Sequence, residues 1–258
     1  MSGRFSESWC DMDIPEFLTD EHRVLHHECG PDEKLKLVCL LDYFQDIAAR
    51  HADLLGVGML RLQEQQLLWV LSRLKLRIRR SPVLGERVRV LTYPTGLNRL
   101  FATRQYQLLD EAGNQLVIGT SFWLVLDRVR FHPVKPFHML ADFVGLNPEK
   151  ERFYPELDKI PEPETVPPRL CEYMVRASHI DLNKHLNNAF VGGYVTDVLG
   201  ILTNGFLTPS ELQINFLHSG ALNDSIHCGG TISDSGEFYV DGRNSDGSQL
   251  YFQAEGNL

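Results

Sequence analysis

The chain has 258 residues, of which 43% are hydrophobic, so it can bury a substantial core as one large domain or as two domains of ordinary size. No segment approaches the roughly 18 consecutive apolar residues of a membrane span, and the N-terminus lacks a basic region followed by an apolar one. These features argue against a membrane span and a secretory signal, and they favour a folded cytoplasmic protein. The net charge of −9 argues against general nucleic-acid binding.

The first half of the chain predicts one long helix followed by an antiparallel sheet. Residues 35–56 carry apolar side chains at helical spacing and end in a glycine that suits a helix C-terminus. Residues 67–78 alternate between apolar and basic side chains, which is the period of a half-buried strand. Further strands are expected over 87–93, 100–109 and 115–126, and the sequence EAGN supplies a hairpin turn between the last two.

Charge is unevenly distributed along the chain. Between Arg73 and Arg104, nine basic residues accompany a single acid, Glu86, whereas beyond Arg176 two basic residues accompany nine acids. We therefore expect a basic surface on one half of the protein and an acidic surface on the other.

A proline-rich segment follows the first set of strands, with eight of the thirteen prolines between His132 and Pro168. Because proline fixes φ and lacks an N–H donor, this segment predicts a boundary: a domain over 1–130, a linker over 131–170 and a domain over 171–258. The second domain repeats the order of the first. It has a short strand over 171–176, a helix over about 188–202 and strands over 211–218, 225–231, 237–241 and 249–255.

The two halves also align residue by residue. DYFQDI, which begins at Asp42, lies beside GYVTDV, which begins at Gly193, with an offset of 197 − 46 = 151. RLKLRIRRSPVLGERV, from Arg73, lies beside ELQINFLHSGALNDSI, from Glu211, with an offset of 212 − 74 = 138. Two matching blocks in the same order predict an internal duplication.

The stretch HIDLNKHLNNAF, just before the second helix, contains the strongest candidate for chemistry. Asn187 or Asn188 can cap that helix, and Asp181 suits the positive end of its dipole. Carried upstream, the offset of 151 places Asp32 and Lys34 opposite Asn183 and His185, so only the second copy has the Asp181, Asn183 and His185 set. A histidine that moves protons beside a carboxylate and free N–H groups favours function over capping alone.

Metal-binding patterns are weak in this sequence. The five cysteines are scattered without a CxxC pair, which fits reduced thiols better than a disulfide framework or a zinc site. The residues His22, His26, His27 and Glu28 are spaced loosely like ligands, but the alternation along HRVLHHEC predicts a strand. We therefore expect no metal and no cofactor. The cysteines are Cys10, Cys29, Cys39, Cys171 and Cys228.

An Asp-x-Asn-x-His-x-Asn-Asn loop running into a helix, preceded by a duplicated helix-plus-sheet unit, resembles the acyl-acyl-carrier-protein thioesterases of plants and bacteria. FQDIAARHADLLG, LLWVLSRLKLRI and FWLVLD are similar to the first domain of that family, and IDLNKHLNNAFVGGYVTDVL is similar to the catalytic segment of its second domain. The resemblance covers most of the chain. It implies an α+β fold of two tandem hotdog domains, each a long helix wrapped by an antiparallel sheet.

The resemblance also implies hydrolysis of a fatty acyl thioester by water, with the acyl chain enclosed by the first domain. His185 would move a proton to or from water or the leaving thiolate, Asn183 would position the thioester or water, and Asp181 would supply charge and orientation. Backbone N–H groups at the start of the following helix, near Asn187, Asn188 and Ala189, are the candidates for holding the oxyanion.

One position departs from the family pattern. Members usually carry a Glu, and in plants an adjacent Cys, shortly after the strand that follows the second helix, where this chain has Ser219 and Gly220. A cysteine nucleophile is thereby excluded at this site. Either Asp181 or His185 activates water, with His218 or Ser219 as a helper, or the protein is a weak hydrolase; a polar strand end is the alternative for Ser219.

The basic strand is a candidate docking surface, because acyl carrier proteins are acidic and positive patches steer such partners. A solvated strand face is the alternative. The rivals for function are a thioesterase acting on coenzyme A esters and a noncatalytic acyl-binding protein, and the chain is expected to be a monomer or a homodimer. The docking candidates are Arg73, Lys75, Arg77, Arg79 and Arg80.

Overall fold

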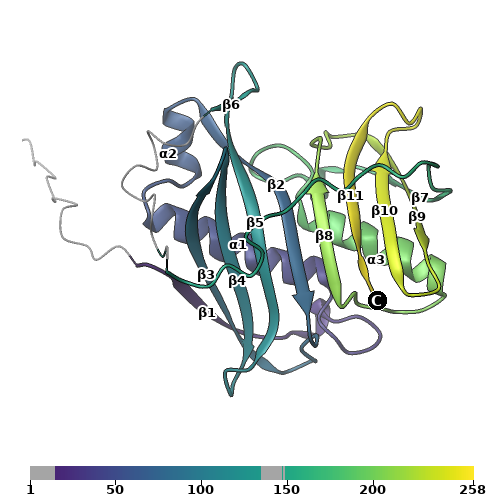
Figure 1. Cartoon of the computed structure of the whole chain (residues 1–258), viewed down its shortest axis with the longest axis horizontal. Helices are drawn as coiled ribbons and strands as arrows, with labels where there is room; N and C mark the ends of the chain where they lie inside the picture. Colours follow the sequence, from purple (N-terminus) through teal and green to yellow (C-terminus); the bar gives the residue numbers. More distant parts are fainter. Residues whose placement is uncertain (1–14, 135–146, 148) are drawn as a thin grey trace, which may run out of the picture.

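The computed structural model describes residues 15–134, 147 and 149–258. Within these residues the protein is one continuous antiparallel sheet of eleven strands, with its long helices on one face (Figure 1). No helix of the described segments is long and apolar enough to cross a membrane.

The elements of the first half agree with the predicted order. The long helix is α1 and the alternating strand is β2, and both lie within two residues of the expected bounds. The predicted strand through HRVLHHEC is wrong in its second part, because β1 ends at Arg23 and a short 3-10 turn follows. The elements are β1 (Leu18–Arg23), η2 (His26–Glu28), α1 (Leu37–Leu54), α2 (Met59–Glu64), β2 (Leu67–Ile78), β3 (Arg87–Asn98), β4 (Phe101–Asp110), β5 (Gln115–Asp127) and β6 (Pro133–Val134).

The second half repeats this order in a shorter form. Its helix begins one residue after the predicted start, and four strands follow it as expected. The elements are β7 (Arg169–Met174), η4 (Ala177–His179), α3 (Ala189–Thr203), β8 (Glu211–Phe216), β9 (Ser225–Ile232), β10 (Glu237–Arg243) and β11 (Leu250–Asn257).

Strand order confirms the duplication. The sheet runs β1-β3-β4-β5-β2 and continues β8-β11-β10-β9-β7, so each half has the same order read outward from the junction of β2 and β8. Leu74 and Leu76 of β2 pair with Ile214 and Leu212 of β8 across that junction. The two halves are therefore two hotdog domains, each a long helix against an antiparallel sheet, joined edge to edge.

Hydrogen bonds confirm the predicted offsets at equivalent positions. Leu35 donates its N–H to the carbonyl of Pro82, and Leu186 donates to the carbonyl of Gly220, both across the loop before the long helix. Glu33 and Lys184 occupy the same place in these loops with φ of 61° and 66°. Local backbone geometry has thus been kept where the side chains have changed.

The helices pack against each other as well as against the sheet. Gly192 of α3 lies against α1, and a Cβ added there would come within 2.7 Å of Leu41 and 3.2 Å of Leu37. Close packing at this glycine brings the first turns of α1 to the start of α3.

Residues 149–168 of the proline-rich segment cross the sheet on the face opposite the helices (Figure 1). Its backbone carbonyls accept hydrogen bonds from Arg73 on β2 at Leu157, from Gln213 on β8 at Asp158 (2.7 Å), and from Gln253 on β11 at Pro161 (3.5 Å). The segment therefore contacts strands of both halves. The division into 1–130, 131–170 and 171–258 stays a prediction.

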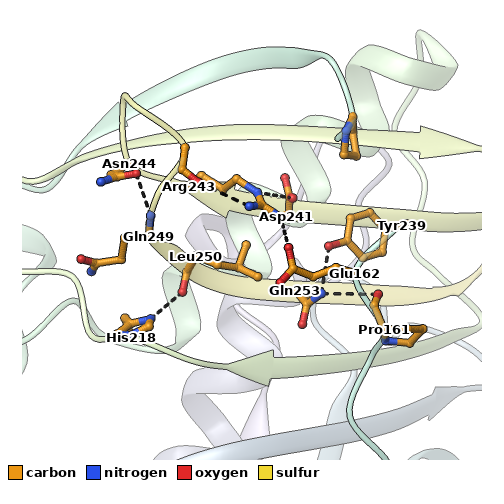
Figure 2. A network of polar contacts seen from close by, with 12 residues as sticks. Pro161, Glu162, His218, Tyr239, Asp241, Arg243, Asn244, Gln249, Leu250 and Gln253 are labelled. Atoms are coloured by element: carbon orange, nitrogen blue, oxygen red, sulfur yellow. Dashed lines mark hydrogen bonds and ion pairs between the residues drawn. The ribbon is translucent and has the colours of Figure 1, made fainter. Parts of the chain in front are cut away.

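Near its end this segment joins a network of charges around the buried Asp241 (Figure 2). Asp241, which is fully buried, accepts from Arg169 at 2.5 Å and from Arg243 at 2.9 Å, and Arg243 also donates to Glu162 of the segment at 2.8 Å. The pKa of Arg243 is raised, despite its burial, by the hydrogen bonds to Glu162 and Asp241. The network fastens the segment to β10.

Candidate active site

The loop between η4 and α3 is a tight turn held by Asp181. The backbone N–H of Asp181 donates to the carbonyl of His185 at 2.8 Å, and one carboxylate oxygen of Asp181 accepts from the N–H groups of Asn183 at 2.8 Å and His185 at 3.3 Å. Asp181 and His185 are half-buried, whereas Asn183 is exposed. The Asp181 carboxylate therefore sets the shape of the loop that carries the other two side chains.

The start of α3 is capped by Asn187 and not by the side chain of Asn188. The side-chain oxygen of Asn187 accepts from the N–H of Ala189 at 3.0 Å, and the Asn187 N–H donates to the carbonyl of His179 at 2.9 Å. The Asn188 N–H has no acceptor among the described residues. Of the predicted oxyanion donors, the Asn188 N–H is therefore available within the described residues, whereas the N–H groups of Asn187 and Ala189 are already hydrogen-bonded.

Asn187 also contacts a carboxylate from the other half of the protein. Its side-chain nitrogen donates to Asp42 of α1 at 3.2 Å. Burial raises the pKa of the Asp42 carboxyl, the hydrogen bond from Asn187 opposes this shift, and the nearby charge of Asp46 adds to it. Sequence reasoning missed Asp42, since the only signal is that its repeat partner, Gly193, has no side chain.

A cavity lies beside this helix start, between α1 and the strands of the first half. Its volume is about 20 Å³, which is room for about one water molecule. Trp123 donates to Ser121 at 2.6 Å and Ser121 to Tyr106 at 3.2 Å, so most of the polar groups on its wall are paired. The lining residues are Leu41, Phe44, Gln45, Leu71, Leu74, Tyr106, Ser121, Trp123, Asn188, Ala189 and Phe216.

Two family models match the chain, the acyl-ACP thioesterase N-terminal domain over residues 16–143 and the acyl-ACP thioesterase C-terminal domain over residues 166–249. The chain belongs to the acyl-ACP thioesterase family. Together the matches include α1, the loop of Asp181 to His185, and α3.

Curated relatives are chloroplast enzymes of plants. A palmitoyl-acyl carrier protein thioesterase of Gossypium hirsutum is 24% identical over 232 residues, which is 82% of this chain and 54% of the relative. An oleoyl-acyl carrier protein thioesterase of Arabidopsis thaliana is 23% identical over 211 residues, which is 74% of this chain and 56% of the relative. The chain spans about half the length of these relatives.

Solved structures share the fold. An acyl-ACP thioesterase from Bacteroides thetaiotaomicron superposes with a TM-score of 0.82 at 19% identity, covering 94% of this chain and 97% of that one. A 12:0-ACP thioesterase from Umbellularia californica superposes with a TM-score of 0.78 at 16% identity, with the same coverage. The whole double-hotdog arrangement is therefore common to these proteins.

The position of the family glutamate lies at the edge of the loop. The carbonyl of Gly220 accepts the N–H of Leu186 at 2.8 Å, and Ser219 and His185 are the residues that precede these two in the chain. Ser219 and His218 are both exposed, and the Nδ1 of His218 is bound to the carbonyl of Leu250 at 2.8 Å (Figure 2). Since a carbonyl only accepts, this nitrogen carries the proton and is not available as a base.

The basic side chains of β2 fall into two groups. Arg73 and Lys75 contact the proline-rich segment, since Arg73 donates to Leu157 and Lys75 lies 5.0 Å from the centre of the Tyr154 ring. Lys75 also pairs with Glu211 of β8 at 2.7 Å. Arg77 is exposed, as are Arg79 and Arg80 just beyond the strand. A partner on this face would therefore meet the second group.

Metal-ligating side chains are not gathered at this site. Within residues 15–134, 147 and 149–258, no group of three His, Cys, Asp or Glu residues is arranged to hold a metal ion. The four described cysteines are free thiols, and Cys10 lies outside the described residues.

Proposed function

We propose that this protein hydrolyses fatty acyl-acyl-carrier-protein thioesters to a free fatty acid and the carrier thiol. The observation that carries the proposal is Asn188 at the start of α3: its N–H has no acceptor among the described residues, and the residue lines a cavity close to the Asp181–His185 loop. A free donor at a helix N-terminus can hold the oxygen of a thioester as it becomes negative. Family membership supports the same reaction.

In this proposal the three loop residues have different tasks. Asp181 orients the loop, because one of its oxygens already accepts two backbone N–H groups. His185 moves a proton at the leaving sulfur, and Asn183 binds the thioester or the water from its exposed position. These roles agree with those that the resemblance implies, except that Asp181 acts through the loop.

The acyl chain would occupy the cavity of the first half after side chains move. The cavity holds about one water molecule in this conformation, and its walls are largely aliphatic and aromatic. Phe44 and Trp123 lie on that wall, so their rotation is one way to lengthen it toward the core of the first domain. Chain-length preference would then be set by residues of α1, β2, β4 and β5.

A panel of substrates tests the proposal. Wild type should release thiol from medium-chain and long-chain acyl carrier proteins, and both His185→Ala and Asp181→Ala should lower the rate about 100-fold or more. If wild type binds acyl chains yet releases no more thiol than these variants, the protein is a noncatalytic acyl-binding protein. A third variant, Ser219→Glu, should increase turnover if the aligned position faces the reacting atoms.

The exposed basic residues near the end of β2 distinguish carrier protein from coenzyme A as the partner. Charge reversal at Arg77 and Arg79 should raise KM for acyl carrier protein about tenfold at low salt and affect acyl-coenzyme A much less. Reversal at Arg87, which is exposed on β3, is the matched control. Equal effects on both substrates would remove the support for docking at β2 and favour the coenzyme A alternative.

A further inference from the structure

We propose that Asp42 of α1 is the base that activates the attacking water. This inference rests on the proposed function and supplies the carboxylate that the chain lacks at Ser219. It assigns a catalytic group of the second domain's site to the helix of the first domain.

The contact between Asp42 and Asn187 places the carboxylate at the start of α3. One oxygen of Asp42 accepts from the Asn187 side chain at 3.2 Å, and the other has no hydrogen-bond partner among the described residues. Asn187 is itself fixed by its bond to the Ala189 N–H at 3.0 Å. The carboxylate is therefore held one residue away from Asn188, the free N–H donor, with an oxygen left for water.

The cavity continues this arrangement on the α1 side. Leu41, which precedes Asp42, and Gln45, which is one turn further along, both line it, as do Asn188 and Ala189. Side chains three and four residues apart lie on one face of a helix, so Asp42 lies on the edge of the face that forms the wall. A thioester carbonyl bound at Asn188 would lie between the loop of His185 and this carboxylate.

The repeat argues against a purely structural role. The position equivalent to Asp42 is Gly193, and the position equivalent to Asn187 is Lys36, so the pair is absent from the other copy. The equivalent loop of the first half keeps the same backbone bonds without either side chain, as the bond from Leu35 to Pro82 shows. The Asp42–Asn187 pair is therefore not required to build this loop and helix start, and it occurs only beside the candidate site.

Asp42 and His185 account for each proton that moves during hydrolysis, and the Asn188 N–H accounts for the charge on the oxyanion. The Asp42 carboxylate takes one proton from water as the water oxygen bonds to the carbonyl carbon, and the Asn188 N–H holds the resulting oxyanion. The oxyanion collapses and the carbon–sulfur bond breaks. The thiolate takes the proton from Asp42 directly or through His185, and the hydroxyl stays on the acid product, which then ionises in solvent.

The surroundings of Asp42 suit a base. Burial raises its pKa above the ordinary carboxyl value, and the negative charge of Asp46 acts in the same direction. Cys39 on the same helix also faces Asp42, and the group facing it from the loop is the neutral amide of Asn187. A half-buried carboxylate with a raised pKa takes a proton from water more readily than an exposed one.

The test compares Asp42→Asn with two other variants. Asp42→Asn should lower kcat/KM for an acyl-acyl-carrier-protein substrate at least 100-fold, and the fall in kcat/KM of wild type at acid pH should be absent from the residual activity. Asp42→Glu, which keeps the carboxylate, should retain at least ten times the activity of Asp42→Asn. Asp46→Asn makes the same charge change one turn along α1, on an exposed residue, and should stay within threefold of wild type.

The variants are expected to fold, because burial disfavours the charged form of Asp42 and an amide can still bond to Asn187; a thermal unfolding curve checks this. If kcat/KM of Asp42→Asn stays within threefold of that of an active wild type, the inference is overturned and the proposed function is left intact. Equal losses of activity in Asp42→Asn and Asp42→Glu would show that Asp42 has a packing role. A loss of activity in Asp46→Asn as large as that in Asp42→Asn would show a general effect of charge. Either result would also overturn the inference. Wild type inactive on every substrate would overturn the proposed function and this inference together.

Discussion

Asn187 and Asn188 are adjacent and have the same side chain, yet their backbone groups differ at the start of α3. The N–H of Asn187 is bound within the loop, whereas that of Asn188 has no acceptor in the described part of the chain, and Asn188 lines the cavity. Asn188 has φ of −54°, which is close to the value that proline imposes. The chain thus offers a way to remove one N–H without changing the local backbone.

Asn188→Pro should lower kcat by about 100-fold to 1000-fold, because it removes the donor that is proposed to hold the oxyanion. The residue before a proline avoids the helical region, and Asn187 lies outside α3. Asn188→Ala keeps the N–H and should stay within a few-fold of wild type. Steady-state kinetics on both variants checks this, and equal activities would contradict a role for this N–H.

At the scale of elements, α1 is joined to the sheet by a buried histidine. His51 accepts from Arg104 of β4 at its Nδ1, 3.0 Å away, so its proton is on Nε2, which donates to Pro15 at 2.9 Å. Burial, followed by the nearby charge of Arg104, lowers the pKa of His51 to about 4. The pair holds α1 against β4 only while the imidazole is neutral.

Stability should therefore fall at acid pH. An unfolded histidine takes up a proton near pH 6.5, well before His51 does so in the folded protein, so the unfolded state is favoured as the pH falls from 6.5 toward 4. Between pH 7 and pH 5 this group should remove about 2 kcal/mol from the free energy of unfolding. Urea unfolding of wild type and His51→Gln measures the difference, and identical pH dependence in the two would contradict the assignment.

At the scale of the molecule, the proline-rich segment and the β2–β8 pairing make the two halves one mechanical unit. The segment bonds to β2, β8 and β11 in turn, and its Glu162 joins Arg243 and Asp241 (Figure 2). Arg169 is the second arginine bound to Asp241. The three tryptophans, Trp9, Trp69 and Trp123, all lie in the first half. Tryptophan fluorescence therefore reports on one half, whereas circular dichroism reports on both.

Asp241→Asn should lower the free energy of unfolding by about 3–5 kcal/mol, because it leaves two guanidinium groups without their shared carboxylate. The loss should appear equally in tryptophan fluorescence and in circular dichroism, although Asp241 lies in the second half. Asp234→Asn, on an exposed turn of the same half, should change little. A fluorescence transition that stays at the wild-type position while circular dichroism shifts would show that the halves unfold separately.

The sequence predicted the elements whose signal is local. The alternation along β2 correctly predicted which of its side chains face the core, since Leu74 and Leu76 are buried and Arg77 is exposed. The offsets between the halves were confirmed by backbone bonds in the equivalent loops. It could not predict that HRVLHHEC turns after Arg23, because an alternating pattern continues across a short 3-10 turn.

By itself, then, the sequence determined the repeated helix-plus-sheet order and the loop of Asp181, Asn183 and His185, because periodicity, turn residues and short motifs act over neighbouring positions. The double-hotdog fold was implied by the resemblance to the family. Only the tertiary structure decided that Asp42 reaches Asn187, which is 145 residues away, that Asn188 has the free N–H, and that the proline-rich segment covers Arg73 and Lys75. Such contacts depend on how closely α1 packs on α3 and on how one sheet pairs with the next. The relative placement of the two helices and the two sheets is set by side-chain packing across the core, which no single stretch of sequence encodes.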